Sequence, residues 1–365
     1  MRRIFLFMCL LFAAGCAKDS VGAGGDEAMQ AVPLAQLIGD LAAGADFSGV
    51  VLVAEKGEPL FLEAFDPPGL NEGVPVSTGS GFAIASMTKS FTAVLVLQLV
   101  EEGRLSLDDT IVTHLPSYKA DYAGRVTVRQ MLQNRSGIPH YISIPGWFDN
   151  DFKRGLTQES LLETVSDLPL AFEPGSDYLY SNTNYYLLGL IIEAVTGKPY
   201  EAVLSERIID PVGLSDTGQI YEPAPIPGLV NDYLREGDGT YHPVPVVNPI
   251  LFRATASQYS TARGLLRWSD ALMEDDLLSM QSKAAMLAPE APMAWTVGSW
   301  PVEEGGTMPF YTYNGQLIGY TSMLTQFPEV GGTIILLNNN NAGYDRLSGM
   351  TVAIAARLYG GAEEE

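Results

Sequence analysis

Ser86 and Lys89 are the residues whose types and spacing point most directly to chemistry. They lie three positions apart at the start of a long apolar segment, and residues three apart on an α-helix share one face. The serine hydroxyl can therefore meet the lysine amine on a single helix, which is the arrangement of a nucleophile beside its base. The same pattern also has a structural interpretation, because serine is a common N-cap residue.

The residues around this pair predict how it is positioned. Segment 79–81 contains two glycines that break regular structure, and the short apolar stretch 82–85 leads up to Ser86. Residues 87–102 are apolar on nearly every face, which predicts a helix buried all round and ended by Gly103. A serine reached through small residues at the start of a buried helix favours a reactive site over a surface cap.

A lysine that acts as a base must lose its proton, although its reference pKa is about 10.4. Burial and a nearby dipole or cation favour the neutral amine, and a further polar group is needed to share or relay the proton. Tyr180 and Asn182 are the best candidates for that group. They lie two residues apart in a loop before a predicted helix, and such residues point the same way in an extended segment. Their structural interpretations are a core aromatic for Tyr180 and a helix N-cap for Asn182.

The order of predicted elements indicates an α+β fold. A helix at 33–43 precedes two strands, 48–55 and 59–65, which a turn at 56–58 joins into a hairpin. Further strands are predicted at 293–300, 308–313, 318–327 and 332–338, before a closing helix at 345–359. Between them, helices are expected at 128–133, 158–165, 182–196, 200–209 and 262–273. We therefore expect one antiparallel sheet built from both chain ends, with 333–337 central, flanked by helices and interrupted by a large helical insertion.

The first residues have the pattern of an export signal. Arg2 and Arg3 precede an apolar run at 4–12, and small residues at 13–15 stand directly before Cys16. This pattern resembles a bacterial lipoprotein signal, so we expect a signal peptide over 1–15 and a lipid anchor on Cys16. The protein would then be exported and membrane-anchored, in the periplasm or at the cell surface. Ala13 stands where leucine is usual, which keeps a plain cleaved signal peptide as the alternative. The run is too short for a transmembrane helix, which needs about 20 residues.

Composition argues against several other functions. The 365 residues carry a formal charge of −22, which disfavours nucleic acid as a partner. The only cysteines, Cys9 and Cys16, lie in the signal region, so we expect no disulfide and no thiol catalysis in the domain. His114, His140 and His242 lack the spacing of a metal site, and we expect neither a metal nor another cofactor.

From Phe47 to about Tyr359 the sequence resembles the serine β-lactamase, penicillin-binding protein and family VIII esterase superfamily, especially its class C-like branch. The similar segments include the first strand, the nucleophile segment and the loops after it, at 47–53, 82–92, 102–109, 126–139, 173–182 and 185–189. The resemblance implies a β-lactamase/transpeptidase-like domain over 33–360. Its sheet part would comprise 33–103 and 291–360, and its helical part 104–290. Residues 16–32 would be a flexible tether and 361–365 a disordered tail.

The resemblance also implies roles for individual residues. Ser86 would be the acylated nucleophile, Lys89 would take its proton, and Tyr180 would shuttle protons to the leaving group and from the deacylating water. Asn182 would bind Lys89 or the substrate amide. The backbone N–H groups of Ser86 and Gln316 would form the oxyanion hole, where negative charge develops.

The third family motif departs from its usual pattern. Members usually carry Lys-Thr-Gly, Lys-Ser-Gly or His-x-Gly, whereas the aligned residues here are Tyr313, Asn314 and Gly315. Gly315 and Gly319 keep the glycine pattern, but a tyrosine supplies no charge where the usual cation holds a substrate carboxylate. Classical penicillinase activity is therefore disfavoured. Arg135, beside Asn134 where members often carry His-Thr, is either a surface residue or a substitute for the missing cation.

We therefore predict an exported serine hydrolase that forms an acyl-enzyme on Ser86. Its substrate would be a small ester or a D-amino-peptide-like amide related to peptidoglycan, as for an esterase or a D-Ala-D-Ala carboxypeptidase. Two alternatives stay open, namely a weak β-lactamase and a non-catalytic, membrane-tethered binding or assembly protein on the same fold. The altered third motif motivates the second alternative, while the intact Ser86, Lys89 and Tyr180 oppose it.

Overall fold

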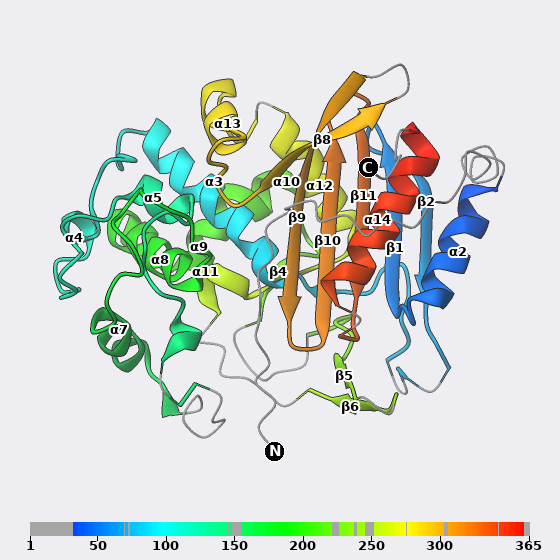
Figure 1. The fold of residues 1–365 in the computed structure, drawn as a ribbon, viewed down its shortest axis with the longest axis horizontal. Helices are drawn as coiled ribbons and strands as arrows, with labels where there is room; N and C mark the ends of the chain where they lie inside the picture. The colour runs from blue at the N-terminus through cyan, green and yellow to red at the C-terminus, as the bar shows by residue number, and fades with distance from the viewer. Residues whose placement is uncertain are drawn as a thin grey trace.

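A six-stranded antiparallel sheet joins the two ends of the chain (Figure 1). The computed structural model describes residues 32–68, 70–71, 74–144, 146–147, 155–220, 226–236, 239–244, 252–274, 276–302, 306–341 and 343–360. In spatial order the strands are β2 (Glu58–Phe65), β1 (Gly49–Glu55), β11 (Gly332–Asn338), β10 (Tyr320–Phe327), β9 (Gly306–Leu317) and β8 (Thr296–Val302). All five neighbouring pairs are antiparallel, which confirms the predicted sheet.

The middle of the sheet is built from strands that are apolar on both faces. All seven residues of β11 are buried, and it lies between β1 and β10, which confirms that 333–337 is central. The predicted hairpin of β1 and β2 is also confirmed. Lys56 and Gly57 turn with φ of 52° and 78°, as a two-residue hairpin loop requires, and Glu55 pairs with Glu58.

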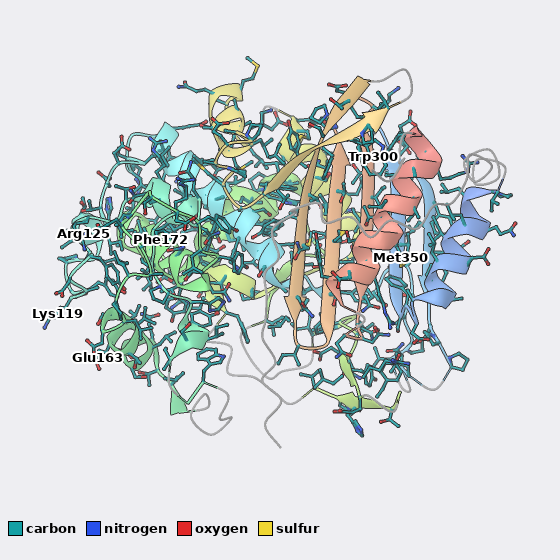
Figure 2. The ribbon with its side chains drawn as sticks, viewed as in Figure 1. Lys119, Arg125, Glu163, Phe172, Trp300 and Met350 are labelled. Carbon is teal, nitrogen blue, oxygen red and sulfur yellow. The ribbon has the colours of Figure 1, made fainter. Side chains whose placement is uncertain are left out.

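Helices cover both faces of the sheet. The helices nearest the two chain ends, α2 (Leu34–Gly44) and α14 (Tyr344–Tyr359), pack together on one face (Figure 1). Trp300 and Met350, labelled in Figure 2, belong to the apolar cluster between these helices and the sheet. On the other face α12 (Ala262–Met273) contacts β1 and β11, and a larger cluster joins the sheet to the helical part of the chain.

The region between β3 and β8 is mostly helical, as predicted. Its longest elements are α3 (Thr88–Glu101) and α8 (Asn182–Thr196), and α8 has the predicted bounds. The shorter ones are α4 (Ile111–His114), α5 (Val128–Leu132), η2 (Tyr141–Ser143), α7 (Gln158–Ser166), α9 (Tyr200–Leu204), η3 (Ser205–Ile209), α10 (Asp210–Val212), α11 (Arg253–Ala256) and α13 (Met280–Met286).

One predicted helix is interrupted. The segment 200–209 was expected to be a single α-helix, but it changes from α9 to a π-helical turn, η3, at Ser205. Asp210 and then Pro211 follow this turn, and the proline has no N–H for the carbonyl four residues earlier and clashes with that carbonyl. A wider turn before the proline relieves both problems.

Two small sheets escaped prediction because their strands are too short to show a period. One contains β3 (Phe82–Ala83), β7 (Gln258–Ser260) and β4 (Gly218–Gln219), and the other pairs β5 (Tyr233–Arg235) with β6 (Tyr241–Pro243). β3 lies just before Ser86 and pairs with β7, so the residues that lead to Ser86 are bonded to a segment far away in the sequence. The predicted signal peptide, Cys16 and the tail at 361–365 lie outside the described residues. In the described ranges, we find no helix with the length and apolar character needed to cross a membrane.

Candidate active site

Ser86 lies on a tight turn between β3 and α3. The turn is a short 3-10 helix, Ala85–Met87, and Ala85 enters it with a left-handed φ of 48°, which L-residues rarely adopt. Neither this turn nor α3 has a side-chain cap, so Ser86 is not the N-cap that its position allowed. Its Oγ instead lies 2.9 Å from Lys89 Nζ and 2.7 Å from Tyr180 OH.

Lys89 is fully buried on the first turn of α3. Its Nζ donates to Ser86 Oγ and to the carbonyl oxygen of Thr255, each at 2.9 Å. The ring centroids of Tyr180 and Tyr185 lie 5.1 Å and 5.8 Å from Nζ, within range of a cation–π attraction. These partners are neutral, so they hold the amine in place without the strong bias toward the charged form that a carboxylate would add.

The surroundings of α3 explain why the lysine stays in this position. Eleven residues of the helix are buried, as the apolar pattern predicted, and Gly103 ends it with a φ of 67°. The buried hydroxyl of Thr92 donates to the carbonyl of Ala254 and pairs with Tyr200 OH. The first turns of the helix are therefore fixed to α11 and α9, which limits the movement of Lys89.

Tyr180 and Asn182 lie on either side of Ser181, whose backbone is extended. Tyr180 brings its hydroxyl to Ser86, as the predicted proton relay requires. Asn182 is the first residue of α8 and not its N-cap, and its Nδ2 donates to Tyr141 OH at 2.9 Å. Its Oδ1 is buried and has no hydrogen-bond partner among the described residues, so it can still accept from a substrate N–H.

Asn134 anchors the loop that carries Tyr180. Its Oδ1 accepts from Ser181 N and Asn184 Nδ2, at 3.1 Å and 3.0 Å, and its carbonyl accepts from Leu179 N. The residue is buried and has a left-handed φ of 52°, which asparagine tolerates better than most residues. Arg135, the candidate substitute cation, donates to the carbonyl of Gly175 at 2.7 Å.

The side chains next to the relay are held neutral. Burial, followed by the nearby positive charge of Lys89, lowers the pKa of His140 to about 3. Its ring lies 4.8 Å from the ring of Tyr141 and 6.2 Å from that of Tyr180. Burial raises the pKa of Tyr141 to about 12 and that of Tyr185 well above its ordinary value. These three side chains next to Lys89 and Tyr180 therefore stay uncharged at neutral pH.

The third predicted segment lies against the nucleophile turn. A Cβ on Gly315 would stand 2.1 Å from the carbonyl oxygen of Ile84, so only glycine fits where β9 passes this turn. Ser322 Oγ donates to the same carbonyl at 3.1 Å. Tyr313, on the same face as Gly315, is 9% exposed and lies 5.8 Å from the ring of Trp295. Gln316 is exposed, and β8 pairs with β9 only as far as Thr312.

Thr255 and Tyr141 contact the predicted site residues but were not anticipated. Thr255 contributes a backbone carbonyl, which any residue type could supply, so no sequence signal marks it. Tyr141 follows the predicted loop 126–139 and is one of 17 tyrosines in the chain. A search for aromatic residues next to that loop would have selected it, although without indicating its bond to Asn182.

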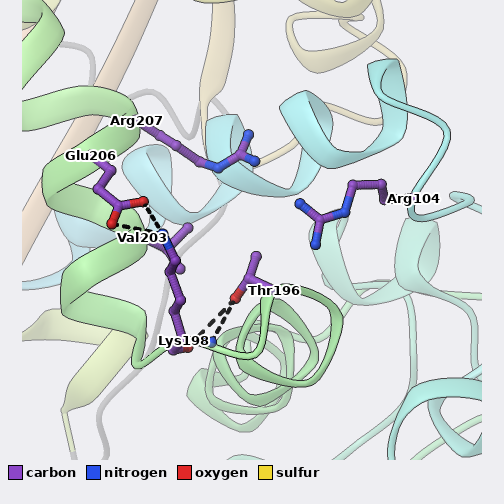
Figure 3. A pocket seen from close by; sticks show the side chains of 6 residues that line it. All are labelled: Arg104, Thr196, Lys198, Val203, Glu206 and Arg207. Carbon is purple, nitrogen blue, oxygen red and sulfur yellow. Dashed lines mark hydrogen bonds and ion pairs between the residues drawn. The ribbon is translucent and has the colours of Figure 1, made fainter.

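A second group of charged side chains lines a small cavity beside the end of α8 (Figure 3). Arg104, Lys198 and Arg207 surround it together with Thr196, Val203 and Glu206. Lys198 contacts Glu206 at 2.7 Å, and Arg207 contacts Glu102 at 2.6 Å. Each of these cations has a carboxylate partner. Among the described residues, no group of three or more histidine, cysteine, aspartate and glutamate side chains is placed to hold a metal ion.

Comparisons with known proteins identify similar sequences and folds. The model of the family described as Beta-lactamase matches residues 34–361. Penicillin-binding protein 4* of Bacillus subtilis (strain 168) is 29% identical over 318 residues, covering 80% of this chain and 68% of that protein. A D-stereospecific amidohydrolase from Streptomyces sp. matches with a TM-score of 0.74 at 25% identity, over 91% of this chain and 100% of that chain. The D-amino acid amidase of Ochrobactrum anthropi, complexed with D-phenylalanine, gives 0.73 at 25% identity, over 89% and 98%.

Proposed function

The chain belongs to the Beta-lactamase family, and from that membership we propose that it is a serine hydrolase working through an acyl-enzyme on Ser86. One observation carries the proposal. Ser86 Oγ contacts a buried lysine amine and a tyrosine hydroxyl at once, at 2.9 Å and 2.7 Å. A nucleophile with two groups that can accept and return its proton is what acyl transfer needs.

In the proposed reaction Ser86 Oγ attacks the substrate carbonyl and passes its proton to the neutral amine of Lys89, directly or through Tyr180. The negative charge that develops on the carbonyl oxygen is stabilised by the backbone N–H groups of Ser86 and Gln316. Tyr180 then delivers the proton to the leaving group, whose bond to the carbonyl carbon breaks. A water molecule then attacks the acyl carbon and gives a proton to Lys89 or Tyr180. The bond between the acyl carbon and Ser86 Oγ breaks, Ser86 regains a proton from the same pair, and the acyl group leaves as the acid.

We propose a small ester or a D-amino-peptide-like amide as the substrate. Tyr313 supplies no cation for a substrate carboxylate, and His140 beside the relay is neutral. This favours acyl donors that need no charged anchor. The similarity to a D-stereospecific amidohydrolase and a D-amino acid amidase supports the amide option. D-Ala-D-Ala carboxypeptidase activity and weak β-lactamase activity are the remaining members of the same reaction class.

Covalent labelling tests the proposal. We expect a fluorophosphonate to add one adduct to the folded protein, and Ser86→Ala to abolish it in intact-mass spectra. Turnover should then be compared for a p-nitrophenyl ester, a chromogenic cephalosporin and a D-Ala-D-Ala peptide. A folded protein that neither forms the adduct nor turns over any of the three would support the second candidate function, a non-catalytic binding or assembly protein.

We also propose export and lipid attachment at Cys16, from the sequence pattern of residues 1–16. Expression in a bacterium with labelled palmitate should place label on the protein, and Cys16→Ala should remove it. A mature N-terminus at another residue, without label, would replace the anchor by the plain cleaved signal peptide.

A further inference from the structure

The turn between β9 and β10 contains a strained residue. Leu317 pairs with Tyr320, so Ile318 and Gly319 form a two-residue turn. Ile318 has a φ of 45°, in the left-handed region that a β-branched residue adopts only at a cost that glycine would avoid. A strained conformation persists only where its surroundings fix it, and it is often found at functional positions.

The strap, residues 228–233, fixes this turn from outside the sheet. Gly319 N donates to Asp232 Oδ2 at 3.3 Å, and a Cβ on Gly319 would stand 2.7 Å from Tyr233 N. Tyr320 OH donates to the carbonyl of Val230. The other end of the strap pairs with Gly81, just before β3, where Gly81 N donates to Gly228 O at 2.8 Å. The strap therefore ties the turn to the segment that leads to Ser86. Figure 1 shows the turn next to β5, which begins where the strap ends.

Burial in the core does not account for the strained isoleucine, because Ile318 is 36% exposed. Its position relative to Ser86 is more informative. Gly315 lies against the carbonyl of Ile84, and Ile318 comes three residues later, about 10 Å along the strand. Another exposed apolar side chain, Tyr178, comes two residues before Tyr180 on a different segment and is 45% exposed. Exposed apolar side chains thus lie on two of the segments that converge on the nucleophile.

We propose that Ile318 is a specificity-determining residue that contacts an extended apolar acyl group of the substrate. The inference rests on the proposed function and adds a substrate class to it, namely esters or amides whose acyl group reaches along the end of β9. An octanoyl chain is long enough to reach Ile318 from the reacting carbonyl, whereas an acetyl group is not. The left-handed turn presents the isoleucine side chain at this position, which explains why the strain is retained.

The test compares kcat/KM for p-nitrophenyl octanoate and p-nitrophenyl acetate in the full chain and its variants. We expect the octanoate-to-acetate ratio to fall about tenfold in Ile318→Gly, the loss expected when an apolar contact of this size is removed. Ile318→Val should retain most of the ratio. The Tm of Ile318→Gly should rise, because glycine relieves the strain.

Lys56→Gly is the matched control, since Lys56 has a φ of 52° in the two-residue turn between β1 and β2. It should also raise Tm, but it should leave the ratio unchanged. An unchanged ratio in Ile318→Gly, or an equal fall in Lys56→Gly, would overturn the inference and leave the proposed function intact. If the unmodified protein shows no Ser86-dependent turnover of either ester, the proposed function fails and this inference fails with it.

Discussion

Two regions of the molecule contain basic side chains, and the burial and bonding partners of these side chains differ between the regions. In the cavity beside α8, Lys198 and Arg207 are partly exposed and contact carboxylates at 2.7 Å and 2.6 Å. At the candidate active site, Lys89 is fully buried and donates to a hydroxyl and a carbonyl. Exposed ion pairs contribute about 0–1 kcal/mol each, whereas a buried cation is expensive unless its partners are well placed.

The difference shows what each arrangement is suited to do. In the cavity, Lys198 and Arg207 are held by carboxylates in ordinary surface ion pairs. Neutral acceptors fix the position of Lys89 more than its protonation state. The amine that would cost most to bury in its charged form is thus the one placed beside Ser86, and this contrast supports the proposed catalysis there.

The largest effect is expected from replacing the buried lysine. Lys89→Met keeps most of the side-chain volume but removes the base, and kcat/KM for p-nitrophenyl acetate should fall by about 1,000-fold or more. The Tm should be maintained or rise, because a buried charge is replaced by an apolar group. Lys198→Met is the matched control and should keep kcat/KM within about twofold of the unmodified protein. A Lys89→Met enzyme within tenfold of the unmodified rate would remove the contrast between the two regions.

Gly315→Ala should have the next largest effect. The added methyl group would meet the carbonyl of Ile84 at 2.1 Å, so β9 or the nucleophile turn must shift. A displacement of about 1 Å at a reacting group can cost about 100-fold in rate. In contrast, Gly349→Ala adds its methyl group to open space on α14 and should leave kcat/KM unchanged. Equal rates for both variants would show that the contact with Ile84 does not position Ser86.

Tyr313→Lys sharpens the comparison by adding a second cation to the active site. We expect the D-Ala-D-Ala peptide and the cephalosporin, which carry carboxylates, to gain about tenfold in kcat/KM relative to a neutral p-nitrophenyl ester. A charge-assisted hydrogen bond to a carboxylate supplies an effect of this size. The three substrates should be measured in parallel, and a proportional change in all of them would refute the role given to the missing cation.

His140 makes stability depend on pH. Its pKa is about 3 in the folded protein and near 6.5 in an unfolded chain, so the unfolded chain binds the proton first as the pH falls. Above about pH 6.5 the titration of His140 therefore does not lower the free energy of unfolding. As the pH falls from about 6.5 toward 3, it lowers this free energy by at most about 1.4 kcal/mol per pH unit. Burial raises the pKa of Asp232 to about 6, so the folded protein binds this proton first. The titration of Asp232 therefore raises the free energy of unfolding as the pH falls from about 6 to 4.

Asp232 is present in both His140→Gln and the unmodified protein, so the difference between their free energies of unfolding reports on His140. Denaturant unfolding between pH 7 and pH 4 should show a shallower loss of stability in His140→Gln. The exposed His242 provides the control, and His242→Gln should follow the unmodified protein. Parallel curves for His140→Gln and the unmodified protein would mean that His140 does not titrate as described.

Much of this molecule was predictable because its main elements have strong local signals. The bounds of α8 and β11 follow from nearly continuous apolar runs, and those of α12 follow from apolar and charged residues at helical spacing. The Lys56–Gly57 turn follows from its residue types. The meeting of Ser86 with Lys89 is a consequence of helical spacing alone. Its meeting with Tyr180, 94 positions away, came from family resemblance and not from any local pattern.

Other parts of the site have no signature in the sequence. Thr255 acts through its backbone carbonyl, and β3 and β7 are two and three residues long, so neither residue type nor period marks them. The contact between Gly315 and Ile84 depends on how β9 meets the nucleophile turn, which is a property of the assembled sheet. Signals within one element could be read directly, whereas contacts between elements required either the resemblance or the structure.

The smallest effect is expected at the cavity, and it completes the comparison. The hydrogen bond from Arg207, the largest cause, and the nearby charges lower the pKa of Glu102. The stability this adds is present above the ordinary pKa and is lost as the pH falls through the lowered one. Because both side chains are partly exposed, Arg207→Gln should cost no more than about 1 kcal/mol in denaturant unfolding at pH 7, and less at high salt. A loss above about 2 kcal/mol that resists salt would show that this ion pair behaves like a buried one. Exposure would then no longer distinguish the ion pairs of the cavity from the buried Lys89.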